Sequence, residues 1–123
     1  MRKTIEIVTQ VNSLPKQGAT MEDVASIVEY LSTDYGETAR LATKYKLIIM
    51  AKAMEPSEKE RTIQYLMETL CTAADSYQQR NLFEIVHSVG SSALRPKLRN
   101  ILNDCHIHTL VRMRCLMALG ALA

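Results

Sequence analysis

The sequence predicts an all-helical protein, with about seven helices joined by short connections into antiparallel hairpins. Apolar residues recur three or four positions apart through most of the 123 residues, which is the periodicity of helices with one buried face. The chain has only 3 prolines and 4 glycines, so long stretches lack the residues that punctuate strands and turns. No segment alternates apolar and polar residues as a half-buried strand does.

The first two helices are predicted over residues 2–14 and 20–31. The first ends before Pro15, and its apolar stripe consists of Ile5, Val8, Val11 and Leu14. Thr20 is a good N-cap for the second helix because its hydroxyl accepts from a first-turn amide. The predicted stripe of this helix consists of Met21, Val24, Ile27, Val28 and Leu31. The polar segment 32–36 ends it.

The third helix is predicted over residues 37–54 and is apolar on most of its surface. One face carries Ala39, Ala42, Tyr45, Ile48 and Ile49. Four more apolar residues extend this surface almost around the helix: Leu47, Met50, Ala51 and Ala53. Because a helix that is apolar on most sides is buried on most sides, we expect it to form the centre of the core. It should end before Pro56.

The next three helices are marked by caps. Ser57 and Glu60 form a capping box for a helix that buries Ile63, Leu66, Met67, Leu70, Cys71 and Ala74. A fifth helix, over 77–89, buries Leu82, Phe83, Val86 and Val89, and Gly90 stands at its C-terminal cap. Ser91 or Ser92 caps a sixth helix, and Pro96 lies in its first turn, where a missing N–H costs little.

Composition excludes several classes of protein. Hydrophobic residues make up 47% and charged residues 23%, which is too apolar for a disordered chain. The net charge of +2 is too small to indicate nucleic-acid binding by itself. The three cysteines show no paired spacing, which favours a reducing compartment. No signal-peptide core and no run of apolar residues long enough to span a membrane is present, so we expect a cytoplasmic or nuclear protein.

Residues 94–123 contain two helix patterns separated by a short turn. The first has leucines at 94, 98 and 102 and ends at Asn103–Asp104; the second begins at Val111–Arg112 and closes with Ala118–Ala123. This segment resembles one HEAT repeat of the HEAT/armadillo-like helical-repeat family. The resemblance implies that Asp104 and Arg112 brace the turn, as part of a ladder between successive repeats. The turn departs from the family because Cys105–His108 replaces its usual Asp- and Pro-rich stretch.

The resemblance implies an α-solenoid, in which hairpins stack into a right-handed superhelix. A lone hairpin cannot cover its own apolar face, and about three stacked units are needed for a stable core. Residues 1–123 would then form a single helical-repeat domain, or the N-terminal fragment of a longer repeat protein, because the sequence stops on an apolar helix without a polar cap. A compact helical bundle is the alternative fold.

Catalytic and metal chemistry are poorly supported by the sequence. The cluster Cys105, His106, His108 and Cys115 lacks the two short-spaced ligand pairs of structural zinc sites, so no metal is expected. Cys71 with His87 would be a nucleophile and base only if the fold brought them together, and a core thiol with a partly buried histidine is the simpler interpretation. The glycines are isolated, so no phosphate-binding loop is present. We expect a protein that is not an enzyme and has no cofactor.

The basic residues are distributed unevenly. Arg95, Lys97, Arg99 and Arg114 lie close together in sequence, and with Arg112 they are opposed only by Asp104. They form the candidate binding site, for a protein partner or for phosphate, although a solvated face is the simpler interpretation. The leading functional hypothesis is a non-catalytic protein-binding scaffold or adaptor, whose binding surface is a ridge of successive second helices. The alternatives are a nucleic-acid-binding protein that uses this cluster, and a structural subunit that self-associates through its apolar C-terminal helix.

Overall fold

The computed structural model describes residues 3–90, 94–104 and 107–121, with the side chains of 104 and 118–121 excepted. Within these residues the chain is all-helical, which confirms the predicted fold class: seven α-helices and one 3-10 helix are present, and no strand. In chain order they are α1 (Thr4–Ser13), α2 (Met21–Ala25), η1 (Val28–Leu31), α3 (Glu37–Lys52), α4 (Pro56–Thr72), α5 (Ser76–Val89), α6 (Arg95–Asp104) and α7 (Thr109–Ala121).

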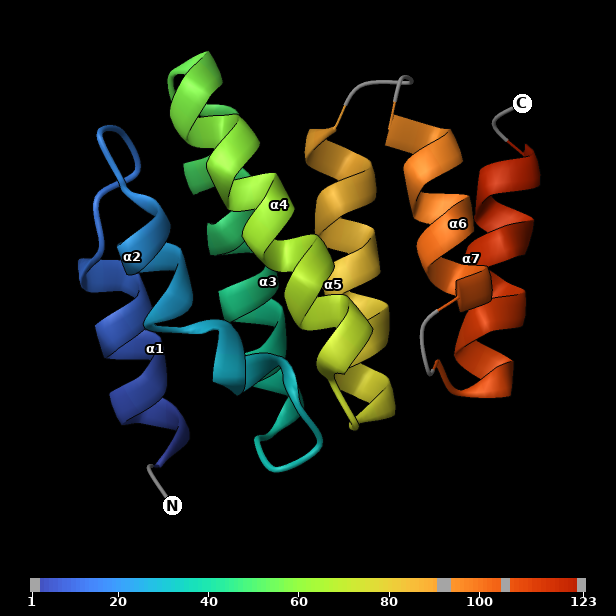
Figure 1. The fold of residues 1–123 in the computed structure, drawn as a ribbon. Helices are drawn as coiled ribbons and strands as arrows, with labels where there is room; N and C mark the ends of the chain where they lie inside the picture. The colour runs from blue at the N-terminus through green and yellow to red at the C-terminus, as the bar shows by residue number, and fades with distance from the viewer. Residues whose placement is uncertain (1–2, 91–93, 105–106, 122–123) are drawn as a thin grey trace.

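The helices pack in two layers (Figure 1). In the first layer α1 packs on α3, α3 on α5, and α5 on α7; we call these four helices the odd-helix layer. In the second, α2 packs on α4 and α4 on α6; we call these three the even-helix layer. Neighbours in sequence, α4 with α5 and α6 with α7, pack across the layers as hairpins. The short η1 contacts both α3 and α5.

One apolar core lies between the layers and extends from Ile7 in α1 to Cys115 in α7. The predicted core positions of the later helices are confirmed, because their leucines are buried completely or nearly so: Leu66, Leu70, Leu82, Leu98 and Leu102. Each recurs every third or fourth position on one side of its helix, so the periodicity was sufficient to place it. Three residues that we expected inside are not buried: Ala74 is exposed in the connection that follows α4, and Cys71 and Val89 are half-buried.

The buried faces of α1 and α3 differ from those predicted. Ile5 is 73% exposed; Val11 is buried as predicted, and Ile7, which is not in the predicted stripe, is the other buried residue of α1. On α3, Tyr45 and Ile49 are 57% and 45% exposed. Because both helices have apolar residues on several sides, periodicity alone could not select the side that meets α1, η1, α4 and α5.

Ala39, Leu47, Met50 and Ala51 of α3 are buried as predicted, but two polar residues of the same helix, Thr43 and Lys46, are buried beside them. The Thr43 hydroxyl donates to the Ala39 carbonyl 2.8 Å away, so its burial leaves no unsatisfied group. Lys46 has a lowered pKa because burial disfavours its charged form, and the nearby charge of Lys16 lowers it further. The centre of the core is therefore less apolar along α3 than the sequence predicted.

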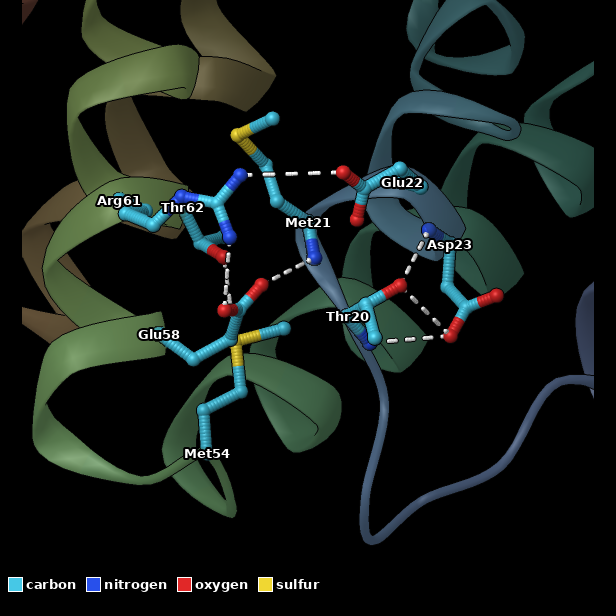
Figure 2. Close-up of polar contacts among 8 residues, drawn as sticks. All are labelled: Thr20, Met21, Glu22, Asp23, Met54, Glu58, Arg61 and Thr62. Atoms are coloured by element: carbon cyan, nitrogen blue, oxygen red, sulfur yellow. Dashed lines mark hydrogen bonds and ion pairs between the residues drawn. The ribbon is translucent and has the colours of Figure 1, made fainter.

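The predicted N-terminal cap of α2 is confirmed, and that of α4 is wrong. Thr20 caps α2: its hydroxyl accepts from the Asp23 amide at 3.3 Å, and the Asp23 carboxylate accepts from the Thr20 amide at 2.9 Å (Figure 2). Ser57 is not a cap, because α4 already begins at Pro56, a residue suited to the first helical position. The segment predicted as one helix over 20–31 is broken after Ala25 and resumes as η1.

A polar junction attaches the short α2 to α4 (Figure 2). The Glu58 carboxylate accepts from the Met21 amide at 2.8 Å and pairs with Arg61 at 3.0 Å. Arg61 reaches back to Glu22 at 3.7 Å. These groups connect the start of α2 to the first turns of α4. Because a helix of five residues is unstable by itself, these contacts stabilise α2 at the end of the even-helix layer.

The ends of α5 and the start of α6 follow the predicted signals. Asp75 caps α5 by accepting from the Gln78 amide at 2.9 Å. Gly90 is the C-terminal cap, but its φ of −77° is not left-handed. A Cβ there would collide with the Leu94 side chain, so glycine is needed for close approach. Pro96 lies in the first turn of α6, as predicted. The expected caps Ser91 and Ser92 lie outside the described residues.

Candidate functional site

Large apolar side chains are exposed on one layer of the fold. Eight such residues are found in the described part of the chain: Ile5, Leu41, Tyr45, Ile49, Tyr77, Leu110, Met113 and Met117. All eight belong to α1, α3, α5 or α7, and none belongs to the even-helix layer. Apolar side chains that gather on one side of a protein are typical of an interaction surface, whereas scattered ones are ordinary. We call the solvent side of this layer the odd-helix face.

Two apolar stripes run along the odd-helix face. Leu41, Tyr45 and Ile49 are spaced by four on α3, so they line one side of that helix. Leu110, Met113 and Met117 have the equivalent spacing on α7 and are 73%, 55% and 71% exposed. Because α3 and α7 both pack against α5, the two stripes flank that helix. Residues of this kind, methionine above all, adapt to the shape of a partner.

The helix between the stripes presents polar groups. Glu84 on α5 pairs with Lys44 at 2.7 Å and with Arg80 at 3.2 Å. The Lys44 side chain is only 14% exposed, so this pair is screened less by water than an ordinary surface pair. Arg40 on α3 lies over the ring of Tyr77, 4.6 Å from its centroid. The Lys44–Glu84 pair and the Arg40–Tyr77 contact connect α3 to α5 across the face.

Two grooves follow the lines where the odd helices meet. The groove between α5 and α7 has a volume of about 440 Å³ and is lined by Tyr77, Arg80, His108, Leu110, Val111 and Arg114, among others. The groove between α3 and α5 has a volume of about 340 Å³, and Tyr45, Phe83, Glu84 and His87 line it. Another depression, of about 550 Å³, lies between α2 and α4 and is lined mainly by polar side chains such as Glu60, Arg61 and Gln64.

Hydrogen bonds connect the turns at one end of the layers. The Thr33 amide, in the turn before α3, donates to both carboxylate oxygens of Asp75 at 3.2 Å. Burial opposes ionisation of Asp75, but hydrogen bonds from the Gln78 and Thr33 amides outweigh it and lower its pKa. Asp75 therefore joins the turn before α3 to the turn before α5.

Gln79 extends this connection to the next turn. Its fully buried amide donates to the Ala73 carbonyl at 2.7 Å and accepts from the His108 amide at 3.2 Å. The His108 ring contacts the Ala74 carbonyl at 2.6 Å. We call the contacts of Thr33, Asp75, Gln79 and His108 the turn ladder. The sequence offered one signal of it: Gln79 is a polar residue within the apolar stripe of its helix, three residues before Leu82.

The predicted basic site is divided between the layers. Arg95, Lys97 and Arg99 lie on α6 in the even-helix layer, where Lys97 and Arg99 are exposed and Arg95 is half-buried. Arg114 lies on α7 and lines the α5–α7 groove, together with Arg80. Sequence reasoning missed Arg80 because it lies far from the cluster in the chain. The structure thus places Arg114 and Arg80 in the lining of the same groove, and none of the described side chains of α6 lines it.

Of the predicted bracing pair, Asp104 and Arg112, only the arginine side chain lies within the described part of the structure. Arg112 is half-buried, and its guanidinium donates to the Ile107 carbonyl at 3.4 Å. It therefore contacts the turn that precedes its own helix, where the family resemblance places a bracing residue. The side chain of Asp104 lies outside the described residues, and its part in a ladder stays a prediction.

The cysteines and histidines do not form a reactive group in the described part of the chain. Burial raises the pKa of the Cys115 thiol to about 12, with a further contribution from the Glu84 carboxylate. Cys71 is disulfide-bonded, which disagrees with the unpaired cysteines and the reducing compartment that the sequence suggested. His87 stacks on Phe83 at 5.6 Å between ring centroids. Cys105 and His106 lie outside the described residues, and no metal-binding group of His, Cys, Asp or Glu is found among the others.

Neither a membrane segment nor a relative helps to assign the protein. In the part of the chain that the structure describes, every helix is too short or too polar to cross a bilayer. Comparison of the chain with protein-family models, with curated proteins and with solved structures gave no match in any of the three. The odd-helix face and its grooves are therefore the features of this protein that bear on its function.

Proposed function

We propose that this protein is a non-catalytic scaffold of the helical-repeat type, which binds a protein partner on its odd-helix face. The observation that carries the proposal is the distribution of exposed apolar side chains: in the described residues all eight lie on the odd helices. Burying such side chains against a partner is the main source of affinity in protein–protein recognition. In the HEAT-like hairpin that residues 94–123 resemble, α7 is the second helix. The odd-helix face then corresponds to the ridge of second helices that the resemblance implies.

The same proposal includes a HEAT/armadillo-like α-solenoid with a right-handed superhelix, in preference to a compact bundle. Two observations support it. Successive hairpins contact their neighbours in order, odd helix on odd and even on even, as in stacked repeats. The turn ladder connects three successive turns, before α3, α5 and α7, which is the arrangement that a repeat ladder produces. In a solenoid, the face formed by one helix of each repeat is an extended surface suited to a partner.

Affinity capture from the cells that make the protein tests the proposal. Tyr45→Glu combined with Met113→Glu places a charge on each apolar stripe, at two exposed positions where folding should be unaffected. A control variant, Gln64→Glu with Lys97→Glu, introduces the same side chains on exposed positions of the even-helix layer. We expect the odd-face variant to lose its partner by about thirtyfold or more in affinity, as for loss of a hot spot of about 2 kcal/mol.

The control should retain the partner, and both variants should keep the wild-type circular dichroism spectrum. Equal capture by the wild type and the odd-face variant would show that the partner binds elsewhere. Nuclease treatment of the lysate separates protein binding from the nucleic-acid alternative. If the captured material is RNA or DNA, and Lys97→Glu removes it, then the basic residues of α6 are the binding site and the proposal is wrong.

Self-association is a second candidate function, which the stripe on α7 favours. Leu110, Met113 and Met117 form an exposed apolar strip that a second copy would cover. Light scattering over a range of concentrations should then detect a dimer that Met113→Glu converts to a monomer. A monomer mass that does not change with concentration excludes this candidate and leaves binding to a different protein.

A further inference from the structure

The groove between α5 and α7 combines cationic and apolar lining residues. Arg80 and Arg114 supply two guanidinium groups, and Tyr77 and Leu110, which are 46% and 73% exposed, supply apolar surface. No aspartate or glutamate is found among the lining residues that the structure describes. A surface of this composition complements a ligand that is both anionic and apolar.

The positive charge at this groove is only partly balanced by the protein. Within the described residues Glu84 is the one carboxylate that pairs with Arg80, and Glu84 also contacts Lys44 at the shorter distance of 2.7 Å. Arg114 has no hydrogen bond or ion pair with any residue of the described ranges. The first turn of α7 also lines the groove, so the positive end of that helix dipole adds to the potential.

We propose that the α5–α7 groove binds an acidic and apolar peptide segment of a partner protein, with a carboxylate between Arg80 and Arg114 and a neighbouring apolar side chain on Tyr77 and Leu110. The inference rests on the proposed scaffold function and specifies the chemistry of the partner. A groove of about 440 Å³ accommodates a few side chains of a peptide and not a folded domain. Arginine is suited to this role because its planar group binds a carboxylate through two hydrogen bonds.

A peptide fits this groove better than a nucleic acid does. Binding along a phosphate backbone needs cations distributed over an extended surface, and its affinity comes mainly from them. Here the other basic residues of the sequence cluster, Arg95, Lys97 and Arg99, lie on α6 and are not among the residues that line the groove. A phosphate backbone would also leave the apolar lining residues Tyr77 and Leu110 uncovered. A segment that carries carboxylates and leucines satisfies both parts of the lining.

Fluorescence polarisation with short labelled peptides tests the inference on the full chain. The probes are a peptide rich in glutamate and leucine, the same peptide with lysine in place of glutamate, and a single-stranded RNA of matched charge. The wild type should bind the glutamate peptide, and Arg114→Glu should weaken this binding by about tenfold. Arg99→Glu makes the same charge change on α6, outside the groove, and should leave the affinity within about twofold. Arg114→Glu should also gain affinity for the lysine peptide, which a general loss of structure would not produce.

Three results would overturn the inference: no binding of the glutamate peptide at low salt, an equal effect of Arg114→Glu and Arg99→Glu, or tighter binding of the RNA. Its failure is distinguishable from failure of the scaffold proposal. If the native partner is lost from the Tyr45→Glu/Met113→Glu variant but retained by Arg114→Glu, the odd-helix face binds protein and the acidic-peptide chemistry is wrong. If neither variant affects capture, the scaffold proposal fails as well.

Discussion

Replacing Gln79 by methionine removes the central contact of the turn ladder. The Gln79 side chain is fully buried and makes hydrogen bonds to the Ala73 carbonyl and from the His108 amide. Methionine has a similar length and volume, so the change leaves little cavity and isolates the loss of the polar contacts. The variant therefore measures how much the connection between successive turns contributes to stability.

The expected loss follows from the two bonds. Each neutral hydrogen bond contributes about 1 kcal/mol, and a buried polar group left without a partner costs about 1–3 kcal/mol. Ala73 is half-buried, so its carbonyl would regain some hydration, and the lower part of that range applies. We expect Gln79→Met to lower the free energy of unfolding by about 2–4 kcal/mol. For a chain of 123 residues, this is a decrease in melting temperature of about 10 °C.

Urea and thermal unfolding, followed by circular dichroism, measure this loss. Gln78→Met is the matched control because Gln78 is the half-buried neighbour on the same helix, and its side chain makes no hydrogen bond within the described residues. Hydrogen exchange provides a local readout, since the His108 amide should lose protection in the Gln79 variant. Equal stability of the two methionine variants, or unchanged protection of the His108 amide, would show that the hydrogen bonds of Gln79 do not stabilise the fold.

Two further predictions concern ionisable groups. Lys46→Met should raise the free energy of unfolding by about 1 kcal/mol near neutral pH, because burial lowers the pKa of Lys46 and so penalises its charged form in the folded state. The exposed Lys52→Met is the control, and a Lys46 variant no more stable than this control contradicts the prediction. In the folded protein the pKa of Asp75 is below its ordinary value of 3.8. The charged carboxylate therefore stabilises the fold above pH 3.8, and this stabilisation is lost as the pH falls through the pKa of the folded state. The stability difference between the wild type and Asp75→Asn should therefore shrink between pH 6 and pH 3 in urea titrations; a difference that does not depend on pH would rule out this role.

The sequence predicted the fold class and most of the later core, and the reason lies in local signals. In α4 and α5 the apolar residues occupy one side, so Leu66, Leu70 and Leu82 had only one direction in which to be buried. In α1 and α3 the signal was ambiguous, because several sides are apolar and the neighbouring helices select among them. The break after Ala25 in the segment 20–31 was also missed, because no glycine or proline marks it in the sequence.

The candidate site was predictable only in part. Arg114 was expected in a basic cluster, but its companion in the groove, Arg80, lies on another helix, and only the packing of α5 on α7 brings them together. The turn ladder was missed for a similar reason. Its members are ordinary polar residues in sequence, and their partners are backbone groups of other turns, which no side-chain pattern reveals.

The wrong prediction of the buried face of α3 bears on function. Tyr45 and Ile49 were assigned to the core because they are apolar, yet the fold exposes them and buries Thr43 and Lys46 instead. A helix under selection for stability alone would be expected to place apolar residues at the buried positions and polar ones outside. The burial of Lys46 has a cost in stability, and the exposure of Tyr45 and Ile49 is explained if the apolar stripe has a partner. Increased stability of Lys46→Met, together with loss of partner binding in the Tyr45 variant, would show that one helix serves both the core and the binding face.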